Sequence, residues 1–456
     1  MKVALFVHCF FPEHFYGTEA YTLELAQNLM AMGHEPVVIC GVFQGETRRK
    51  SAISSFEYLC IPVYCLDKNY FPHKDIGETY YQSNLINVHR KLLSDIQPDV
   101  IHVTHLINHT AALLDAAKAL EIPVVATLTD FFGICFNNRL EAADGSLCEG
   151  PNKDRTNCLA CYLKASAEIK QATMLARLTG RYSRLLPAIA HSLNVFSQLP
   201  GMHHGSLARI IGDIVKRPDV LSSCYSTYQT AIAPTQFLKS AYLANGLRVP
   251  MPVMHFGVDV PRAPKTVRDP STPVRFGFIG QLAKHKGTDL LVNAFSRLPS
   301  GTTELYIYGS EDQDPEYVAA LKSSKKINPV FFRGTFPKER LPNVLDEIDI
   351  LVIPSRWYEN SPLVLLNSLA THTPVIVSDV AGMTEFVEDG KNGFVFRRSN
   401  VDDLTRVMLT IIRHPELIEP MSKRTEYSRT TREMTEEVVC IYTMILKADA
   451  HRVITR

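Results

Sequence analysis

Short, continuous runs of apolar residues alternate with segments of helical periodicity along most of this chain. The first run, Val3–Val7, is followed by Thr18–Met32, in which apolar side chains recur at helical spacing, and then by a second run at Pro36–Cys40. Continuous apolar runs are typical of central parallel strands, because both faces of such strands are buried. The order therefore predicts a strand-helix-strand unit at the start of the chain.

The same alternation continues in both halves of the chain. In the first half it predicts a helix near Ala111–Leu120 and strands at Val100–Val103, Val124–Thr127 and Thr230–Ala233. In the second half the predicted strands are Arg275–Ile279, Leu305–Tyr308, Val330–Arg333, Ile350–Pro354 and Val375–Ser378. The predicted helices between them are Thr288–Leu298, Pro315–Ser323, Lys338–Glu347 and Leu363–Ala370. This pattern is typical of the α/β class, with a doubly wound, Rossmann-like sheet in each half.

The length of 456 residues exceeds what one hydrophobic core usually supports, so two domains are expected. Prolines at positions 250, 252, 261, 264, 270 and 273 mark a stiff linker between them. We predict an N-terminal domain at residues 1–250, a linker at 251–273 and a C-terminal domain at 274–430. The last segment, residues 431–456, is predicted to be a helix that packs back on the N-terminal domain.

The stretch Ile353–Ala370 carries the most informative chemistry. A buried strand is followed by a short turn, and Asn360, Ser361 and Pro362 are predicted to open a helix, with the proline at its first helical position. Such a helix directs free N–H groups at the crevice above the strand tips. Glu359 is expected at its lip, with Asn367 two helical turns further along the same side. A carboxylate, an amide and free helix N–H groups together suit a sugar phosphate as ligand. The alternative interpretation is an ordinary helix N-terminus with a capping carboxylate.

Four cysteines fall within one loop-rich segment, residues 135–161. Cys135, Cys148, Cys158 and Cys161 have the spacing C-x12-C-x9-C-x2-C, and the segment contains no histidine. Four thiolates at such spacing can form a closed, structural zinc site. The alternative is that the cysteines are reduced and bind no metal.

The next segment, residues 162–220, is predicted to be a helical insertion with a local excess of basic residues. Arg177, Arg181 and Arg184 share one face of a predicted helix. A face of this kind can contact anionic lipid at the inner face of the cytoplasmic membrane, or hold a phosphorylated acceptor. A solvated basic surface is an equally good interpretation.

Composition adds few constraints. An apolar content of 46% and a charged content of 21% are ordinary for a folded soluble protein. The net charge of +1 provides no overall field for nucleic acid, and no nucleic-acid partner is expected. No apolar run approaches the roughly 18 residues of a membrane span. The first apolar run reaches Pro12 without a signal-peptide cleavage site, and the ten scattered cysteines favour a reducing cytoplasm.

Four motifs together resemble those of the family 4 retaining glycosyltransferases, which have the GT-B architecture of two Rossmann-like domains facing a cleft. The segments are FFPEHFYGTEAYTLELAQNLMAMGHE (10–35), FIGQLAKHKGTDLLVNAF (278–295), SRWYENSPLVLLN (355–367) and SDVAGMTEFVEDGKNGFVF (378–396). The resemblance extends along nearly the whole chain. It implies a nucleotide diphosphate sugar as donor. No Asp-x-Asp metal motif of convincing placement appears in the sequence, so we expect chemistry that requires no metal or other cofactor.

The resemblance also implies roles for individual residues. Lys286, Glu359 and Asp130 would be catalytic, Lys286 by neutralising the donor diphosphate and Glu359 by contacting the sugar hydroxyls. The implied donor-binding residues are Gly17, Gln281, Lys286, Glu359, Asn360, Ser361, Pro362, Leu363, Val364 and Asn367.

Three positions depart from the family pattern. Gln281 stands where the family often has arginine, Asn367 replaces the last acid of its E-x7-E motif, and Thr129 replaces the histidine before Asp130. From the four motifs we nevertheless expect a cytoplasmic, metal-independent glycosyltransferase with a glycan or lipid-linked acceptor. A nucleotide-sugar-binding scaffold without turnover, and another GT-B chemistry such as a sugar epimerase or phosphorylase, are the alternatives.

Overall fold

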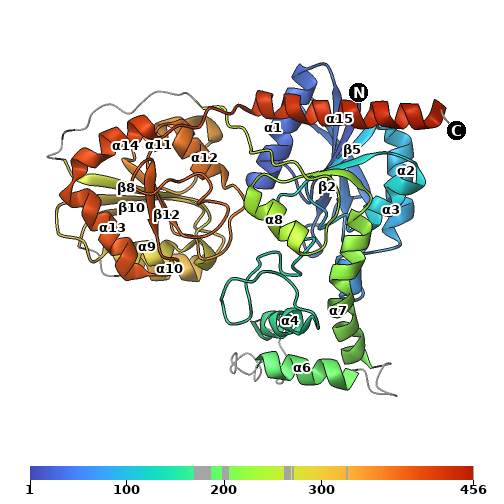
Figure 1. Ribbon diagram of the computed structural model, residues 1–456, viewed down its shortest axis with the longest axis horizontal. Coiled ribbons are helices and arrows are strands. Elements are labelled where there is room, and N and C mark those ends of the chain that lie inside the picture. Colours follow the sequence, from blue (N-terminus) through green and yellow to red (C-terminus); the bar gives the residue numbers. More distant parts are fainter. Residues whose placement is uncertain (169–185, 198–204, 261–268, 270–271, 325–326, 455–456) are drawn as a thin grey trace. The chain divides into compact units, whose positions relative to one another are not determined.

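The computed structural model describes residues 1–168, 186–197, 205–260, 269, 272–324 and 327–454. The chain divides into two compact units, which Figure 1 shows in the colours of the sequence. The first unit consists of Met1–His255 together with Arg432–Arg456, and the second of Phe256–Thr431.

The first unit contains a seven-stranded sheet in the order β3-β4-β2-β1-β5-β6-β7. Its strands are β1 (Lys2–Phe6), β2 (Glu35–Val42), β3 (Ile53–Tyr58), β4 (Ile61–Asp67), β5 (Val100–Val103), β6 (Val124–Thr127) and β7 (Tyr228–Ile232). Its regular helices are η1 (Gly77–Thr79), α1 (Gly17–Ala31), α2 (Leu85–Ile96), α3 (Ala112–Ala119) and α8 (Gln236–Ala244). All neighbouring strands are parallel except β3 and β4, which form an antiparallel pair at the edge. The predicted β5 and β6 are confirmed at their predicted bounds.

In the described part of the connection from β6 to β7 there are three helices, drawn in teal to green in Figure 1. They are α4 (Thr156–Glu168), α6 (Leu186–Ser197) and α7 (Ser206–Tyr225). Leu159, Leu186, Ile211 and Ile214 are buried in a small core of their own. The predicted basic face of Arg177, Arg181 and Arg184 lies outside the described residues.

The last helix, α15 (Thr431–Ile454), returns to the first unit from Arg432 onward. Tyr442 is fully buried there, and its hydroxyl lies 2.5 Å from Nδ1 of His102, on β5. The other ring nitrogen of His102 lies 2.8 Å from Oγ1 of Thr127, on β6. A buried hydrogen-bonded chain therefore ties α15 to two central strands.

The second unit contains a six-stranded sheet in the order β10-β9-β8-β11-β12-β13, with every pair parallel. Its strands are β8 (Val274–Ile279), β9 (Thr303–Tyr308), β10 (Val330–Phe332), β11 (Ile350–Ile353), β12 (Val375–Ser378) and β13 (Gly393–Phe396). Its helices are η3 (Lys284–Lys286), α9 (Thr288–Phe295), α10 (Pro315–Ser323), η4 (Lys338–Arg340), α11 (Leu341–Asp346), α12 (Leu363–Ala370), α13 (Val401–Arg413), η5 (Pro415–Leu417) and α14 (Ile418–Arg424).

The two sheets confirm the predicted α/β class with two Rossmann-like sheets. One predicted helix, Lys338–Glu347, is divided into η4 and α11. Pro342 explains the division, since proline has no N–H and is tolerated only in the first turn of an α-helix. The α-helix therefore begins at Leu341.

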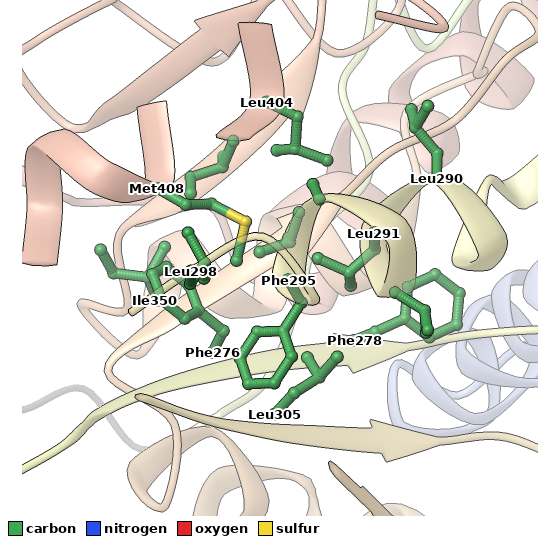
Figure 2. Close-up of a cluster of buried hydrophobic side chains, with 14 of the residues drawn as sticks. Phe276, Phe278, Leu290, Leu291, Phe295, Leu298, Leu305, Ile350, Leu404 and Met408 are labelled. Carbon is green, nitrogen blue, oxygen red and sulfur yellow. The ribbon is translucent and has the colours of Figure 1, made fainter. Parts of the chain in front are cut away.

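The core of the second unit lies between the sheet and the helices α9 and α13. Figure 2 shows Phe276 of β8, Leu305 of β9, Phe295 of α9 and Met408 of α13 in this core. Burial of large apolar side chains, at about 25 cal/mol per Å², is the main stabilising contribution. This packing fixes the strand tips that carry the residues described next. Among the described residues, no helix is long and apolar enough to cross a membrane.

We expect Tyr442→Phe to lower the melting temperature of the protein. The substitution leaves Nδ1 of the buried His102 without its partner, and an unpaired buried polar atom costs about 1–3 kcal/mol. Met444→Ala on the same helix is the control, because the Met444 side chain is 62% exposed. Thermal unfolding measures both variants, and equal melting temperatures would contradict the structural role of the His102–Tyr442 contact.

Candidate functional site

An ion pair links the carboxyl ends of two neighbouring strands in the second unit. Nζ of Lys286, from η3 after β8, donates to Oε1 of Glu359 at 2.7 Å, and Glu359 follows β11. The Glu359 side chain is 8% exposed and the Lys286 side chain 23% exposed. The carboxylate is therefore held inside the protein, while its cationic partner still reaches solvent.

Two close approaches of the backbone place the ion pair. Gly287, with a φ of +74°, lies after Lys286, and a Cβ there would be 2.0 Å from the carbonyl oxygen of Pro354. Gly382, with a φ of +87°, lies beside the turn of Glu359, and a Cβ there would be 1.6 Å from the Glu359 carbonyl oxygen. Only glycine combines a positive φ with so little space. These two glycines therefore fix the positions of Lys286 and Glu359.

Neighbouring side chains complete the environment of the Glu359 carboxylate. Ser355 Oγ donates to Oε1, and Trp357 Nε1 donates to the same oxygen at 3.1 Å. The hydroxyl of Ser378 in turn donates to the Ser355 carbonyl oxygen at 2.6 Å. Burial alone would raise the pKa of Glu359, but Lys286 and these donors hold the pKa below its ordinary value. The side chain is therefore an ionised, oriented acceptor at neutral pH.

The helix α12 has its predicted bounds, Leu363–Ala370, but Pro362 has a different place from the one predicted. Leu363 is the first helical residue, and Pro362 is the N-cap with an extended ψ of 122°. The prediction that proline occupies the first helical position was wrong. Ser361 explains the shift, because its left-handed φ of +55° turns the chain before the helix can start.

No side chain caps α12, so its first N–H groups have no partner from a cap. The Ser361 hydroxyl is buried and makes no hydrogen bond in the described part of the chain. A non-glycine residue in the left-handed region costs on the order of 1–3 kcal/mol, and such strain is found mainly at functional sites. The turn before α12 thus gathers unused donors beside Glu359.

The remaining predicted donor residues have ordinary local roles in the structure. Asn367 lies about one turn into α12. It does not lie two helical turns beyond Glu359 as predicted, because Glu359 precedes the helix. Nδ2 of Asn367 donates to the Leu363 carbonyl oxygen at 2.7 Å. Gln281 is half-buried in the loop after β8.

Arg356 lies in the turn before Glu359 and was not a predicted donor residue. It makes a bidentate pair with Asp289, at 2.7 and 2.8 Å, so the charge of Arg356 is already balanced.

In the first unit, Asp130 lies just beyond the carboxyl end of β6 and pairs with Nε2 of His105, beyond β5. The backbone N–H of Ile107 donates to Nδ1 of His105 at 3.1 Å, so the ring proton is on Nε2 and points at Asp130. Burial would raise the pKa of Asp130, but His105 and the Phe132 and Asn138 donors hold the pKa below its ordinary value. This pair was not predicted from the sequence.

Two further histidines near the end of β5, His102 and His109, are structural. Burial lowers the pKa of His102 to about 3 and that of His109 well below its usual value, so both rings are neutral. His109 Nε2 hydrogen-bonds to the Val7 carbonyl oxygen at 2.9 Å. Thr129, in the place of the family histidine, donates to the Thr104 carbonyl oxygen at 2.7 Å.

Two further features lie near the strand tips of the first unit. Gly17 is the first residue of α1, and a Cβ there would meet nothing within 4 Å, so local packing does not require glycine. His8, Cys9 and Glu19 bring their ligand atoms within 4.8 Å of one another. In this group Glu19 Oε1 accepts from Cys9 Sγ at 2.8 Å and lies 3.1 Å from His8 Nε2. Burial raises the pKa of Cys9 far above its usual value, which favours a hydrogen-bonded thiol over a metal ligand.

Comparison with known proteins identifies the family. A model described as "Glycosyl transferases group 1" matches residues 259–430, and one described as "Glycosyltransferase Family 4" matches residues 15–138. Together they match more than half of the chain, one in each unit. The chain belongs to glycosyltransferase family 4. The family predicted from the four motifs is thereby confirmed.

Curated relatives match over part of their length. The glycogen synthase of Mycobacterium tuberculosis is 29% identical over 36% of this chain and 40% of its own. The mannosylfructose-phosphate synthase of Agrobacterium fabrum is 27% identical over 33% of this chain and 36% of its own. The chain thus spans less than half the length of these relatives.

Solved structures match over the whole chain. The sucrose-phosphate synthase of Thermosynechococcus elongatus has a TM-score of 0.60 at 14% identity and covers 100% of both chains. Anabaena HepE, solved with UDP and glucose, has a TM-score of 0.59 at 15% identity and covers 99% of each chain. These likenesses show that the family 4 chain has the GT-B fold.

We expect Gly382→Ala to destabilise the second unit more than Gly390→Ala does. Both glycines have a positive φ of similar size, but a Cβ at Gly390 meets nothing within 4 Å. Each substitution should cost about 1–2 kcal/mol for the left-handed backbone, and the clash at Gly382 should add about 1–3 kcal/mol. Urea unfolding compares the two variants, and equal loss of stability would show that the approach to Glu359 imposes no constraint.

Proposed function

We propose that the protein transfers a hexosyl group from a nucleotide diphosphate sugar to a hydroxyl of a glycan or a lipid-linked acceptor. The transfer would retain the anomeric configuration and use no metal ion in its chemistry. The observation that carries the proposal is the Lys286–Glu359 pair, which stands beside the uncapped start of α12 and the unpartnered hydroxyl of Ser361. A cation, a buried acceptor and free donors are what a sugar diphosphate requires.

Lys286 would act on the diphosphate. Its ammonium group has three N–H donors, of which one is directed at Glu359, so two can meet phosphate oxygens. The leaving diphosphate gains negative charge as the glycosidic bond breaks, and a fixed cation stabilises that developing charge. Glu359 keeps the ammonium in place before the donor arrives.

Glu359 would orient the donor sugar. Ser355, Trp357 and Lys286 all bond to Oε1, which leaves Oε2 as the acceptor for sugar hydroxyls. The phosphate or the sugar would be contacted by the N–H groups at Leu363 and Val364 and by the Ser361 hydroxyl. The neighbouring turn at Asn360 and Pro362 would face the same part of the ligand. Asn367 would contact the ribose after its amide leaves the Leu363 carbonyl, and Gln281 would meet the phosphate without adding a charge.

The first unit would supply the acceptor side. Asp130 is kept ionised and half-buried by His105, at the end of the sheet where ligands bind in open α/β folds. Such a carboxylate can accept a hydrogen bond from an acceptor hydroxyl and strengthen its oxygen as a nucleophile. Gly17, at the start of α1, offers an open backbone N–H for an anionic group.

A binding protein without turnover is the second candidate. It is favoured by Asn367, whose amide is satisfied within its own helix, and by the neutral Gln281 at a position where the family often has arginine. A thermal-shift screen with UDP-, GDP-, ADP- and dTDP-sugars finds the donor, because a ligand of the folded state raises the melting temperature. Release of nucleotide diphosphate that depends on an acceptor then distinguishes a transferase from a scaffold. Failure of every nucleotide sugar to bind would overturn both functions.

With the donor identified, Lys286→Ala and Glu359→Ala should have different effects. Lys286→Ala should weaken both the bare nucleotide diphosphate and the donor by about 10-fold or more, since hydrogen bonds to charged groups contribute about 1.5–3 kcal/mol. Glu359→Ala should spare the bare nucleotide diphosphate and lower turnover by about 100-fold or more. Lys391→Ala, which removes an exposed ion pair with Glu388 in the same unit, should change neither. Calorimetry with each ligand decides, and equal loss of nucleotide diphosphate in both site variants would contradict the division of roles.

Asn367→Glu should tighten nucleotide binding by about 1 kcal/mol, roughly 5-fold, because a charged acceptor replaces a neutral one at the ribose. Asn367→Gln is the matched control, since it has the length of glutamate without the charge. Calorimetric titration with the nucleotide diphosphate measures both variants. Equal affinities of the two variants would remove Asn367 from the ribose contact.

A further inference from the structure

The four cysteines of residues 135–161 line one small cavity of the first unit. They are Cys135, Cys148, Cys158 and Cys161. None of them belongs to the proposed transfer site. Four sulfurs around one cavity are a set that a soft metal ion would use.

Local structure explains why the four cysteines line one cavity. The bridge between Glu141 and Leu147 closes a tight hairpin, and the N–H of Cys148 donates to the Leu140 carbonyl oxygen at 2.8 Å. The hairpin carries the chain from Cys135 back beside α4. Cys158 and Cys161 are three residues apart in the first turns of α4, so they lie on the same face of that helix.

The sulfurs are present as hydrogen-bonded thiols. Cys135 Sγ donates to Asn137 Oδ1 at 2.7 Å, and Cys161 Sγ donates to the Glu141 carbonyl oxygen at 3.6 Å. In the described chain, no three of the four sulfurs lie within 4.8 Å of one another. A tetrahedral tetrathiolate site with metal–sulfur distances of about 2.3 Å needs sulfurs about 3.8 Å apart. Binding of a metal therefore requires the thiols to leave their present acceptors.

A bound zinc ion would replace the present thiol hydrogen bonds, because zinc binds the deprotonated sulfur and neutralises its charge.

Arg217 is an independent sign of missing negative charge at this place. It comes from α7, is 3% exposed, and its Nη1 has no hydrogen-bond partner among the described residues. Its Nη2 donates to the Phe132 carbonyl oxygen. Phe132 lies three residues before Cys135, and the Arg217 guanidinium also packs over the Phe132 ring at 5.0 Å from its centroid. A buried guanidinium without an anion is costly, and zinc held by four thiolates has a net charge of −2 that would compensate it.

Cys148 already has the surroundings of a ligating sulfur. The N–H of Gly150 donates to its Sγ at 3.4 Å, and Asn157 Nδ2 donates to the same atom at 3.8 Å. Donors of this kind orient thiolate ligands and reduce their charge.

We propose that Cys135, Cys148, Cys158 and Cys161 bind one zinc ion in a closed, structural site, with Arg217 as its buried counter-charge. Four protein ligands fill the tetrahedral shell, so the ion has no open position for catalysis. Its role is to hold the loop-rich segment 135–161 against α4 and α7.

Metal analysis of the full chain, untagged and purified in reducing buffer, tests the site. We expect about one zinc per chain, lost from the double variant Cys158→Ser, Cys161→Ser. The control is the double variant Cys60→Ser, Cys440→Ser, which removes two exposed thiols elsewhere and should keep its zinc. Wild-type protein without metal, iron in place of zinc, or zinc retained by the first double variant would each overturn the proposal.

Two further measurements keep the test independent of misfolding. Cobalt substituted into the wild type should show the intense visible bands of a tetrahedral tetrathiolate site, and Cys148→His should bind cobalt with shifted bands, since zinc sites accept imidazole. Arg217→Met should weaken zinc by about 10-fold or more, whereas Arg217→Lys should retain most of the affinity. An unchanged zinc affinity in a folded Arg217→Met protein would remove Arg217 from the site, and cobalt without these bands would overturn the tetrathiolate set.

Discussion

A buried carboxylate is tolerated only where its charge is compensated, and the second unit is arranged around this constraint at Glu359. Lys286 supplies the opposite charge, and Ser355 and Trp357 supply hydrogen bonds to the same oxygen. All of these contacts require the tips of β8, β11 and β12 to approach within a few ångströms. Gly287 and Gly382 permit that approach because they have no Cβ. The positions of the glycines, the serines and the ion pair therefore depend on one another.

Compensation of this charge also explains how one site could serve the two parts of the proposed donor. The ion pair fixes Lys286 without using all of its donors, and it fixes Glu359 without using its second oxygen. These remaining groups are the ones that we propose for contact with a diphosphate and a sugar. Preorganisation of this kind reduces the cost of ordering side chains when a ligand binds. The strain of Ser361 fits the same description, since its left-handed backbone turns the free end of α12 toward these groups.

Hydrophobic patterning predicted most of the second sheet, because central parallel strands leave continuous apolar runs in the sequence. Val375–Ser378 and Leu363–Ala370 have their predicted bounds. The antiparallel edge strand β3 was not predicted, since Ile53–Tyr58 mixes polar and apolar residues with partial exposure. Lys286 and Glu359 were predicted as site residues from a family resemblance, whereas their mutual contact depends on tertiary approach at glycines. Ser378 and His105 likewise have no local signal, because their partners lie on other strands.

The first unit links its proposed acceptor side directly to the cysteine segment. Asp130 Oδ2 accepts from Asn138 Nδ2 at 3.0 Å, and Asn138 Oδ1 accepts from the N–H of Phe131 at 2.7 Å. The N–H of Cys135 donates to the Phe131 carbonyl oxygen at 2.7 Å, so the first cysteine lies in the turn that holds the carboxylate. A metal that fixes Cys135 would therefore restrict this turn and, through Asn138, the orientation of Asp130. His105 fixes the carboxylate from the other side through a defined tautomer. The cysteine segment thus stands next to the Asp130 carboxylate, and a bound ion would add rigidity there.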